Sequence, residues 1–174
     1  MSRVADLMGE WAEVLGVPAA DRVRWRAAGY LHDCLRDAPV GALRAMVPET
    51  FDGLNGRLLH GPAAAARLRQ DGVADEPLLL AITWHTTGHP DLDRLGRCLY
   101  IADFIEPGRR HEPVQLARLR ERMPADVDGV LRDVLQMRIA HVLREQRPLR
   151  SETAAFWSAV NARTAATGNP DVGC

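Results

Sequence analysis

Residues 27–33 read AAGYLHD, so an apolar helical segment ends in adjacent imidazole and carboxylate side chains, His32 and Asp33. Apolar residues recur at helical spacing through this segment, which is expected to begin near Asp21, a residue type that caps helix N-termini. Adjacent side chains cannot share one helix face, but at a helix end both can turn toward a common cation. An imidazole and a carboxylate together favour zinc, manganese or iron(II) over calcium.

Helical periodicity extends over most of the chain, and strictly alternating runs of Val, Ile and Thr are missing from the sequence. The pattern predicts helices over residues 3–15, 21–33, 39–47, 62–70, 76–85, 91–105 and 125–146, and a last helix capped by Ser151. Residues 50–55 are expected to form a loop, because Asp-Gly and Asn-Gly pairs lie in and beside them. We therefore expect an all-α, single-domain helical bundle of about seven to nine helices over residues 1–166, with a frayed C-terminal tail at 167–174.

Composition narrows the class of protein. The 174 residues suit one compact domain, with 47% hydrophobic and 26% charged residues. A formal net charge of −1 argues against a nucleic-acid partner bound by a general basic field. No apolar run approaches the roughly 20 residues that span a bilayer, and three acidic residues in the first 16 are unlike a signal peptide. Three cysteines without CxxC spacing disfavour disulfides and thiolate zinc sites. We expect a cytoplasmic, reduced protein without a membrane partner.

Three further residues of metal-ligand type lie at helix ends or in apolar surroundings. His60 directly precedes one predicted helix, His85 ends another, and Asp103 lies within the apolar run of residues 98–105. A carboxylate in such a run is costly to bury unless it is paired or binds a metal. Taken singly, each histidine has an ordinary explanation as a packing or capping residue, and Asp103 could partner a buried arginine. The ordered set, together with His32 and Asp33, favours a metal centre.

The motifs HD at residues 32–33, LLHGP at 58–62, WHTTGHP at 84–90 and YIADFIEPGR at 100–109 carry a resemblance. The chain resembles the HD-domain superfamily and, within it, the YqeK family of symmetrical diadenosine-tetraphosphate hydrolases, from about Val4 to beyond Pro148. The resemblance implies an HD-type helical fold and an enzyme that cleaves diadenosine tetraphosphate to two ADP. A small-molecule nucleotide would then be the partner, and a homodimer is left open.

The resemblance also implies two divalent metal ions, with iron named first and manganese, zinc and cobalt left open by the ligand types. By position, His32, Asp33 and Asp103 would hold one metal, and His60 and His85 the second, with Asp33 bridging. Asp33, Glu106 and Arg109 are the catalytic candidates that follow. The substrate-binding candidates are Arg36, Thr86, Thr87, Glu106 and Arg109.

Several of these residues keep an alternative interpretation. Glu106 would orient water or protonate the leaving group, or would simply begin a Pro-Gly turn. The two threonines would bind phosphate or cap a helix C-terminus. The arginines would bind polyphosphate in a bidentate manner or form a solvated basic edge.

The sequence departs from the family pattern at its start. The pattern includes a first-helix histidine, a ligand of the first metal, which would fall just before Met1. Either the chain starts after that position or the first metal keeps three protein ligands. Two other functions therefore stay open: an HD phosphohydrolase acting on another nucleotide, and a nucleotide-binding module with an impaired metal site.

Overall fold

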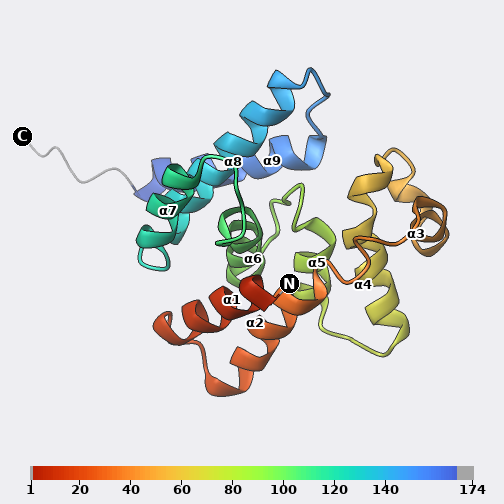
Figure 1. Ribbon diagram of the computed structural model, residues 1–174, viewed down its shortest axis with the longest axis horizontal. Coiled ribbons are helices and arrows are strands. Elements are labelled where there is room, and N and C mark those ends of the chain that lie inside the picture. Colours follow the sequence, from red (N-terminus) through yellow and green to blue (C-terminus); the bar gives the residue numbers. More distant parts are fainter. Residues whose placement is uncertain (1, 168–174) are drawn as a thin grey trace, which may run out of the picture.

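The computed structural model describes residues 2–167, and the side chains of residues 2–162. Over this range the chain is helical, with no strand, which confirms the all-α fold class (Figure 1). The elements are α1 Ser2–Val14, α2 Ala19–Leu31, α3 Val40–Met46, η1 Glu49–Phe51, η2 Gly56–Leu58, α4 His60–Gln70, α5 Glu76–Trp84, α6 Arg94–Ile105, α7 Pro113–Arg122, α8 Val127–Arg144 and α9 Ser151–Thr167. None of these helices is both long and apolar enough to cross a membrane.

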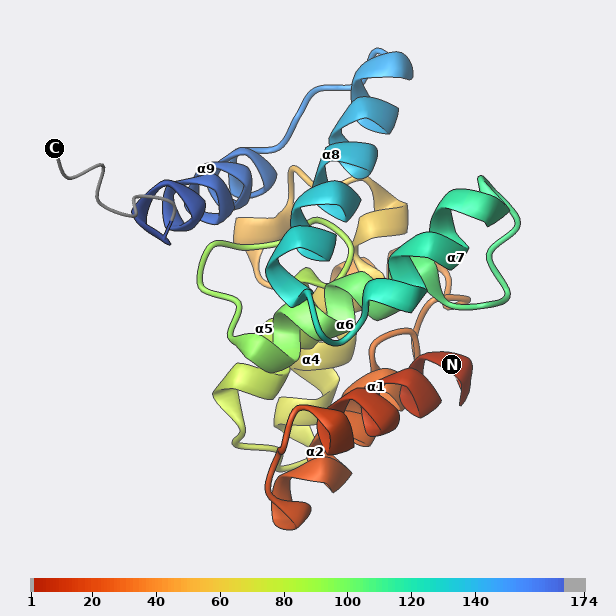
Figure 2. The same cartoon turned by 90° about the vertical axis from the view of Figure 1, so that its left-hand side faces the viewer.

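The centre of the bundle is α6, which contacts α1, α2, α5, α7 and α8 (Figure 2). Ten of its twelve residues are buried, including the carboxylate-bearing Asp103 near its C-terminal end. Its N-terminus is capped by Asp93, whose side chain accepts a hydrogen bond from the amide of Gly96. A charged residue therefore lies in the best-packed helix of the protein.

The first two helices pack side by side through a close backbone approach at Gly29. A Cβ atom at this position would lie 2.4 Å from the Cα atom of Ala5, so only glycine allows the two helices to approach this closely. The prediction that Asp21 caps α2 is wrong, because the helix begins at Ala19 and Pro18 occupies the N-cap position. Asp21 instead lies in the first turn, where its negative charge suits the helix dipole.

Two segments differ from the sequence prediction. The first two residues of the expected loop at 50–55 belong to the short 3-10 helix η1, and a second one, η2, begins directly after the loop. The helix α7 was not expected, since only Leu116 and Leu119 of its residues are buried and the apolar pattern is correspondingly weak. Neither segment supplies a predicted site residue.

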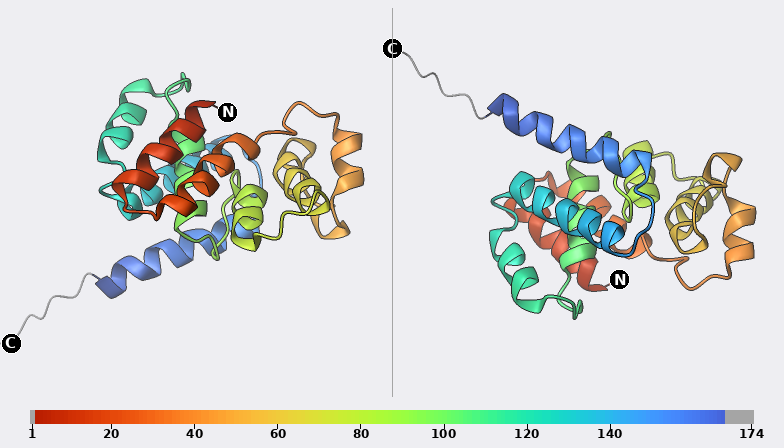
Figure 3. Two further views of the ribbon diagram at one scale, coloured as in Figure 1. Left: turned by 90° about the horizontal axis from the view of Figure 1, so that it is seen from below. Right: turned by 90° about the horizontal axis from the view of Figure 1, so that it is seen from above.

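A small second hydrophobic cluster lies beside the start of α4. It is formed by Leu43, Leu54, Leu59 and Ala63, and it fixes α3 and the 3-10 helices against α4. Figure 3 shows this part of the chain at one end of the molecule, while α9 lies on the outside and extends away from the bundle. The frayed tail expected at 167–174 falls, apart from Thr167 at the end of α9, outside the described residues.

Candidate metal centre

The five residues predicted as metal ligands come together where four helices meet. His32 is the C-cap of α2 and is followed by Asp33, His60 is the first residue of α4, His85 is the C-cap of α5, and Asp103 lies in the last turn of α6. His32 and His85 are each only 1% exposed. Residues separated by up to 71 positions in the sequence thus share one buried centre.

The three imidazole rings are held in the same way. In each, Nδ1 lies within hydrogen-bond distance of the carbonyl oxygen three residues earlier, at 2.9 Å for His32, 2.8 Å for His60 and 2.8 Å for His85. A ring that donates its Nδ1–H to a carbonyl carries its lone pair on Nε2. The backbone at the helix ends therefore favours the tautomer that a metal needs, with Nε2 facing the centre.

The carboxylate of Asp33 lies between the imidazoles. Its Oδ1 atom is 3.1 Å from Nε2 of His60 and 3.5 Å from Nε2 of His85, while its Oδ2 atom is 3.6 Å from Nε2 of His32. Burial raises the pKa of Asp33, but the hydrogen bonds from His60 and His85 more than offset that effect and the pKa is lowered. The ionised carboxylate therefore faces one imidazole with one oxygen and two imidazoles with the other.

Two of the imidazole nitrogens nearly touch. Nε2 of His60 and Nε2 of His85 are 3.0 Å apart, so two lone pairs would repel each other unless a proton or a cation lies between them. Burial lowers the pKa of His85, whereas at His60 the effect of burial is outweighed by Asp33 and the Arg57 carbonyl, and the pKa is raised. A proton between the two nitrogens is therefore favoured on His60 over His85.

This donor set fits a transition metal. One ligand atom each from His32, Asp33 and His85 lies within 4.8 Å of the others, and their carboxylate and imidazole groups are the donors that such ions prefer. A bound divalent cation would take the place of such a proton and accept the imidazole lone pairs. The residues present are therefore those that a divalent cation requires.

The fifth predicted ligand, Asp103, divides its oxygens between two directions. Oδ1 lies 3.8 Å from Nε2 of His32 and also accepts a hydrogen bond from Arg109, while Oδ2 accepts one from Arg138 at 3.0 Å. Burial raises the pKa of this carboxyl group, but His32 and the two arginines lower it overall. Asp103 is therefore ionised within the core.

The two arginines predicted to bind substrate lie at the edge of the centre. Nη1 of Arg36 is 2.9 Å from Oδ2 of Asp33, and its side chain is 56% exposed. Nε of Arg109 donates to the carbonyl oxygen of Asp103 at 2.9 Å. Arg36 thus contacts Asp33 and Arg109 contacts Asp103, and both guanidinium groups remain accessible to solvent.

The other predicted residues have structural partners. Oε2 of Glu106 accepts hydrogen bonds from Nε of Arg3 at 2.5 Å and from the amide of Gly108 at 2.6 Å. Burial raises the pKa of Glu106, but these contacts lower it overall, which favours the turn-forming interpretation over a proton donor. Oγ1 of Thr86 lies 3.0 Å from Nε2 of His85, and the carbonyl of Thr87 accepts a hydrogen bond from α9.

Sequence reasoning missed Arg138, which contacts Asp103 from α8. A buried carboxylate predicts a cationic partner, but the sequence contains 22 basic residues and does not show which of them is near. The contact spans 35 residues, so no local spacing could have identified it.

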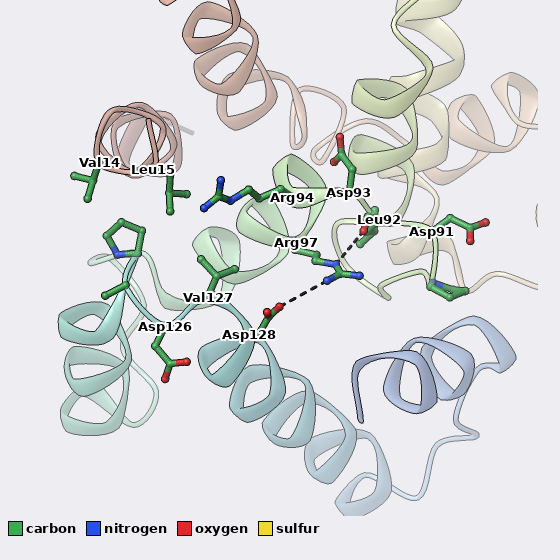
Figure 4. Close-up of a pocket in the computed structure, with 13 residues that line it drawn as sticks. Val14, Leu15, Asp91, Leu92, Asp93, Arg94, Arg97, Asp126, Val127 and Asp128 are labelled. Atoms are coloured by element: carbon green, nitrogen blue, oxygen red, sulfur yellow. Dashed lines mark hydrogen bonds and ion pairs between the residues drawn. The ribbon is translucent and has the colours of Figure 1, made fainter. Parts of the chain in front are cut away.

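A cavity of about 820 Å³ lies elsewhere, between the end of α1, residues 90–97 and the start of α8 (Figure 4). Its charged lining includes Asp93, Arg94 and Asp126, and Arg97 reaches the carbonyl of Leu92 at 3.0 Å. None of the described residues that line it is a predicted site residue. The candidate centre is therefore identified by its converging side chains, not by this cavity.

Comparison with known proteins gives one family and relatives that share one enzyme name. Residues 1–108 match the HD domain family. A symmetrical bis(5'-nucleosyl)-tetraphosphatase of Halalkalibacterium halodurans is 28% identical over 145 residues, 80% of this chain and 76% of that protein. The enzyme of the same name from Staphylococcus aureus is 34% identical over 113 residues, 62% of this chain and 57% of that protein.

A solved structure shares the architecture as well. It is an HD superfamily hydrolase from Clostridium acetobutylicum, described as involved in NAD metabolism, with a TM-score of 0.80 and 28% identity. The match covers 93% of this chain and 87% of that one. The family match covers more than half of the 174 residues and contains all five predicted ligands, and the chain therefore belongs to the HD domain family.

Proposed function

We propose that this protein is a metal-dependent hydrolase of dinucleoside polyphosphates that cleaves diadenosine tetraphosphate symmetrically to two ADP. The observation that carries the proposal is the convergence of three imidazole Nε2 atoms on the carboxylate of Asp33, with distances of 3.1–3.6 Å. The substrate and the symmetrical cleavage follow from the relatives, which are named for that activity.

Two divalent metals fit the donor set, and iron is the proposed metal, with manganese, zinc and cobalt as alternatives. His32, Asp33 and Asp103 would hold one metal, and His60 and His85 the other, with Asp33 shared. When bound, such a pair supplies a nucleophile of lowered pKa and neutralises charge on the phosphoryl oxygens. The Nδ1 contacts with backbone carbonyls keep the three rings oriented for this task.

Arg36 and Arg109 are proposed to bind the polyphosphate and orient it. Each now contacts a carboxylate that would also serve as a metal ligand. A divalent cation held by that carboxylate would weaken its attraction for the arginine, and the guanidinium N–H groups could then donate to phosphate oxygens. Glu106 fixes the turn that carries Arg109, through its contacts with Arg3 and the amide of Gly108.

The reaction itself has a simple balance. The oxygen of one water molecule adds to one of the two central phosphorus atoms, and the bond from that phosphorus to the oxygen between the two central phosphorus atoms breaks. Two ADP molecules result, and the protons of the water pass to the product phosphates or to solvent. The leaving group is ADP, which departs through an oxygen of its terminal phosphate, so cations near that oxygen favour its departure. The lowered pKa of Glu106 leaves it without a proton to donate at neutral pH.

The test is product chromatography with diadenosine tetraphosphate, after purification under low oxygen and metal quantification. ADP as the sole product supports the proposal, whereas ATP with AMP would refute symmetrical cleavage. Hydrolysis of another nucleotide alone would move the function to a different HD phosphohydrolase, and nucleotide binding without turnover would indicate a binding module. The proposal also includes a cytoplasmic location. Light scattering of the purified protein will test whether it forms a homodimer.

Variants test the centre directly. His60→Ala, His85→Ala and Asp103→Ala should each lower activity by more than about 100-fold, since even the partners behind metal ligands cost about 10–100-fold. Helical content measured by circular dichroism should stay close to that of the parent protein. The control is His141→Ala, an exposed residue of α8. Loss of activity in that variant would show that the wrong histidines were chosen.

A further inference from the structure

Helix α8 lies beyond the part of the chain that matches the HD domain family, which ends at residue 108. It nevertheless places the guanidinium group of Arg138 against the candidate metal centre. Nη2 of Arg138 donates to Oδ2 of Asp103 at 3.0 Å, and Nη1 donates to the carbonyl oxygen of Thr86 at 3.0 Å. One side chain therefore joins a carboxylate of α6 to the residue that follows His85.

We propose that Arg138 is a positioning residue, which holds Oδ2 of Asp103 so that Oδ1 faces His32 as the metal-binding oxygen. This inference rests on the metal centre proposed above. The Oδ1 atom is the one that lies 3.8 Å from Nε2 of His32. A carboxylate restrained at one oxygen cannot rotate freely, so its other oxygen is kept ready for a cation.

The guanidinium group is itself fixed. Its Cζ atom lies 4.5 Å from the ring centroid of Tyr100 and 5.0 Å from that of Phe104. Cations over aromatic rings are attracted at these distances, most strongly when water is excluded. Tyr100 is buried, so Arg138 has packing on its faces and hydrogen bonds at its edge.

Burial distinguishes Arg138 from the arginines assigned to substrate. Its side chain is 17% exposed, compared with 56% for Arg36. Both of its terminal nitrogens already donate to protein oxygens. We therefore assign it to the carboxylate, not to the polyphosphate.

Arg109 and Arg138 also act on different oxygens of Asp103. Arg109 contacts Oδ1, the oxygen that faces His32, and so competes with a cation for it. Arg138 contacts Oδ2, so its hydrogen bond persists when a cation binds Oδ1. Loss of Arg138 should weaken metal binding, because Oδ2 is then no longer restrained. Loss of Arg109 should not weaken it, because Arg109 contacts the oxygen that the metal would bind.

The experiment is a cobalt(II) titration of metal-free protein, followed by the visible absorption of the bound ion. Arg138→Met removes the charge and the hydrogen bonds at similar side-chain length, and should lower cobalt affinity about 10–100-fold. Arg144→Met is the matched control, because Arg144 is an exposed arginine of the same helix. Its affinity should equal that of the parent protein.

Two further measurements separate the outcomes. At saturating cobalt, the KM of Arg138→Met for diadenosine tetraphosphate should stay within about twofold of the parent value. The reason is that Arg138 is assigned no contact with the substrate. A raised KM with unchanged cobalt affinity would place Arg138 at the substrate and overturn the inference. If the parent protein takes up no cobalt, the metal centre itself fails, and with it the proposed function.

Arg138→Lys covers the case in which Arg138→Met does not fold. A lysine keeps the positive charge but cannot hold a carboxylate and a carbonyl in one planar fork, so its cobalt affinity should lie between those of the parent and of Arg138→Met. Where only the lysine variant folds, affinity equal to that of the parent protein would refute the inference.

Discussion

Gly61 allows the helices that carry His60 and His85 to approach each other. A Cβ atom at Gly61 would lie 2.7 Å from the carbonyl oxygen of Ile82, 2.9 Å from that of Thr83 and 3.2 Å from Cε1 of His85. These contacts are too short to persist, and two of them are with backbone, so Gly61→Ala must separate α4 from α5. The Ile82 carbonyl also accepts the Nδ1–H of His85, so the displacement reaches the candidate metal centre.

The magnitude follows from a matched control. Gly41 lies exposed in α3 with no atom within 4 Å of the Cβ that alanine would add. Gly41→Ala should therefore stabilise the protein by about 0.4–1 kcal/mol, through lower entropy of the unfolded chain. Gly61→Ala has the same gain but adds an overpacking cost of about 1–3 kcal/mol. The difference between the two variants isolates that cost and corresponds to roughly 2–12 °C in Tm for a chain of this size.

Urea unfolding of the metal-free variants measures the stability difference, and cobalt titration measures the effect on the centre. Gly61→Ala should bind cobalt at least about 10-fold more weakly, because displaced ligands no longer share one cation. Gly41→Ala should bind it as the parent protein does. Equal stability and equal cobalt affinity in the two variants would refute the argument that close packing of α4 on α5 builds the site.

Three more predictions concern other parts of the structure. Asp75→Ala should lower the free energy of unfolding by about 1–2 kcal/mol in urea titrations, because Asp75 caps α5 and pairs with Arg24 of α2. The pKa values of Asp33 and Asp103 are lowered, so their stabilising effect is complete above about pH 4 and is lost as the pH falls through the lowered values. Metal-free protein should accordingly lose stability below about pH 4 in urea unfolding series, and constant stability there would contradict the ion pairs described. Gly88→Ala should lower Tm, since Gly88 has φ +77° and its Cβ would lie 2.3 Å from an aromatic carbon of α9.

Much of the helical pattern was predictable because helix periodicity is a local property of the sequence. The ends of α5 and α8 lie within two residues of the expected positions. Two helix predictions failed. The apolar pattern of α7 is weak, because only two of its residues are buried. Asp21 is a residue type that caps helices, but it lies three positions after Pro18, which occupies the N-cap position of α2. Tertiary packing, not the local apolar pattern, determines α7, and the restricted backbone at Pro18 determines where α2 begins.

The candidate site was predictable in part for the same reason. The motifs around His32, His60 and His85 place each histidine at a helix end, and the structure brings these residues together with Asp33 and Asp103. The sequence also offered two explanations for Asp103, a metal ligand or the partner of a buried arginine. The structure shows that these are compatible, since one oxygen faces His32 and the other contacts an arginine. Long-range contacts of this kind have no signature in residue spacing.

Charge at the centre differs from the charge of the chain. The protein as a whole has a formal net charge of −1, which argued against a general basic field. Around the two carboxylates of the centre, however, three guanidinium groups lie in contact, those of Arg36, Arg109 and Arg138. Glu106 also pairs with Arg109 at 3.7 Å and with Arg3 at 2.5 Å, so the ion-paired groups here are four arginines and three carboxylates, a net charge of +1 before any divalent cation is added. Salt screens the field of these charges over about 8–10 Å. The site should therefore attract a compact polyanion that enters it more strongly than an extended polyanion that lies along the surface. A short polyphosphate chain between two nucleosides has that character, and long nucleic acid does not.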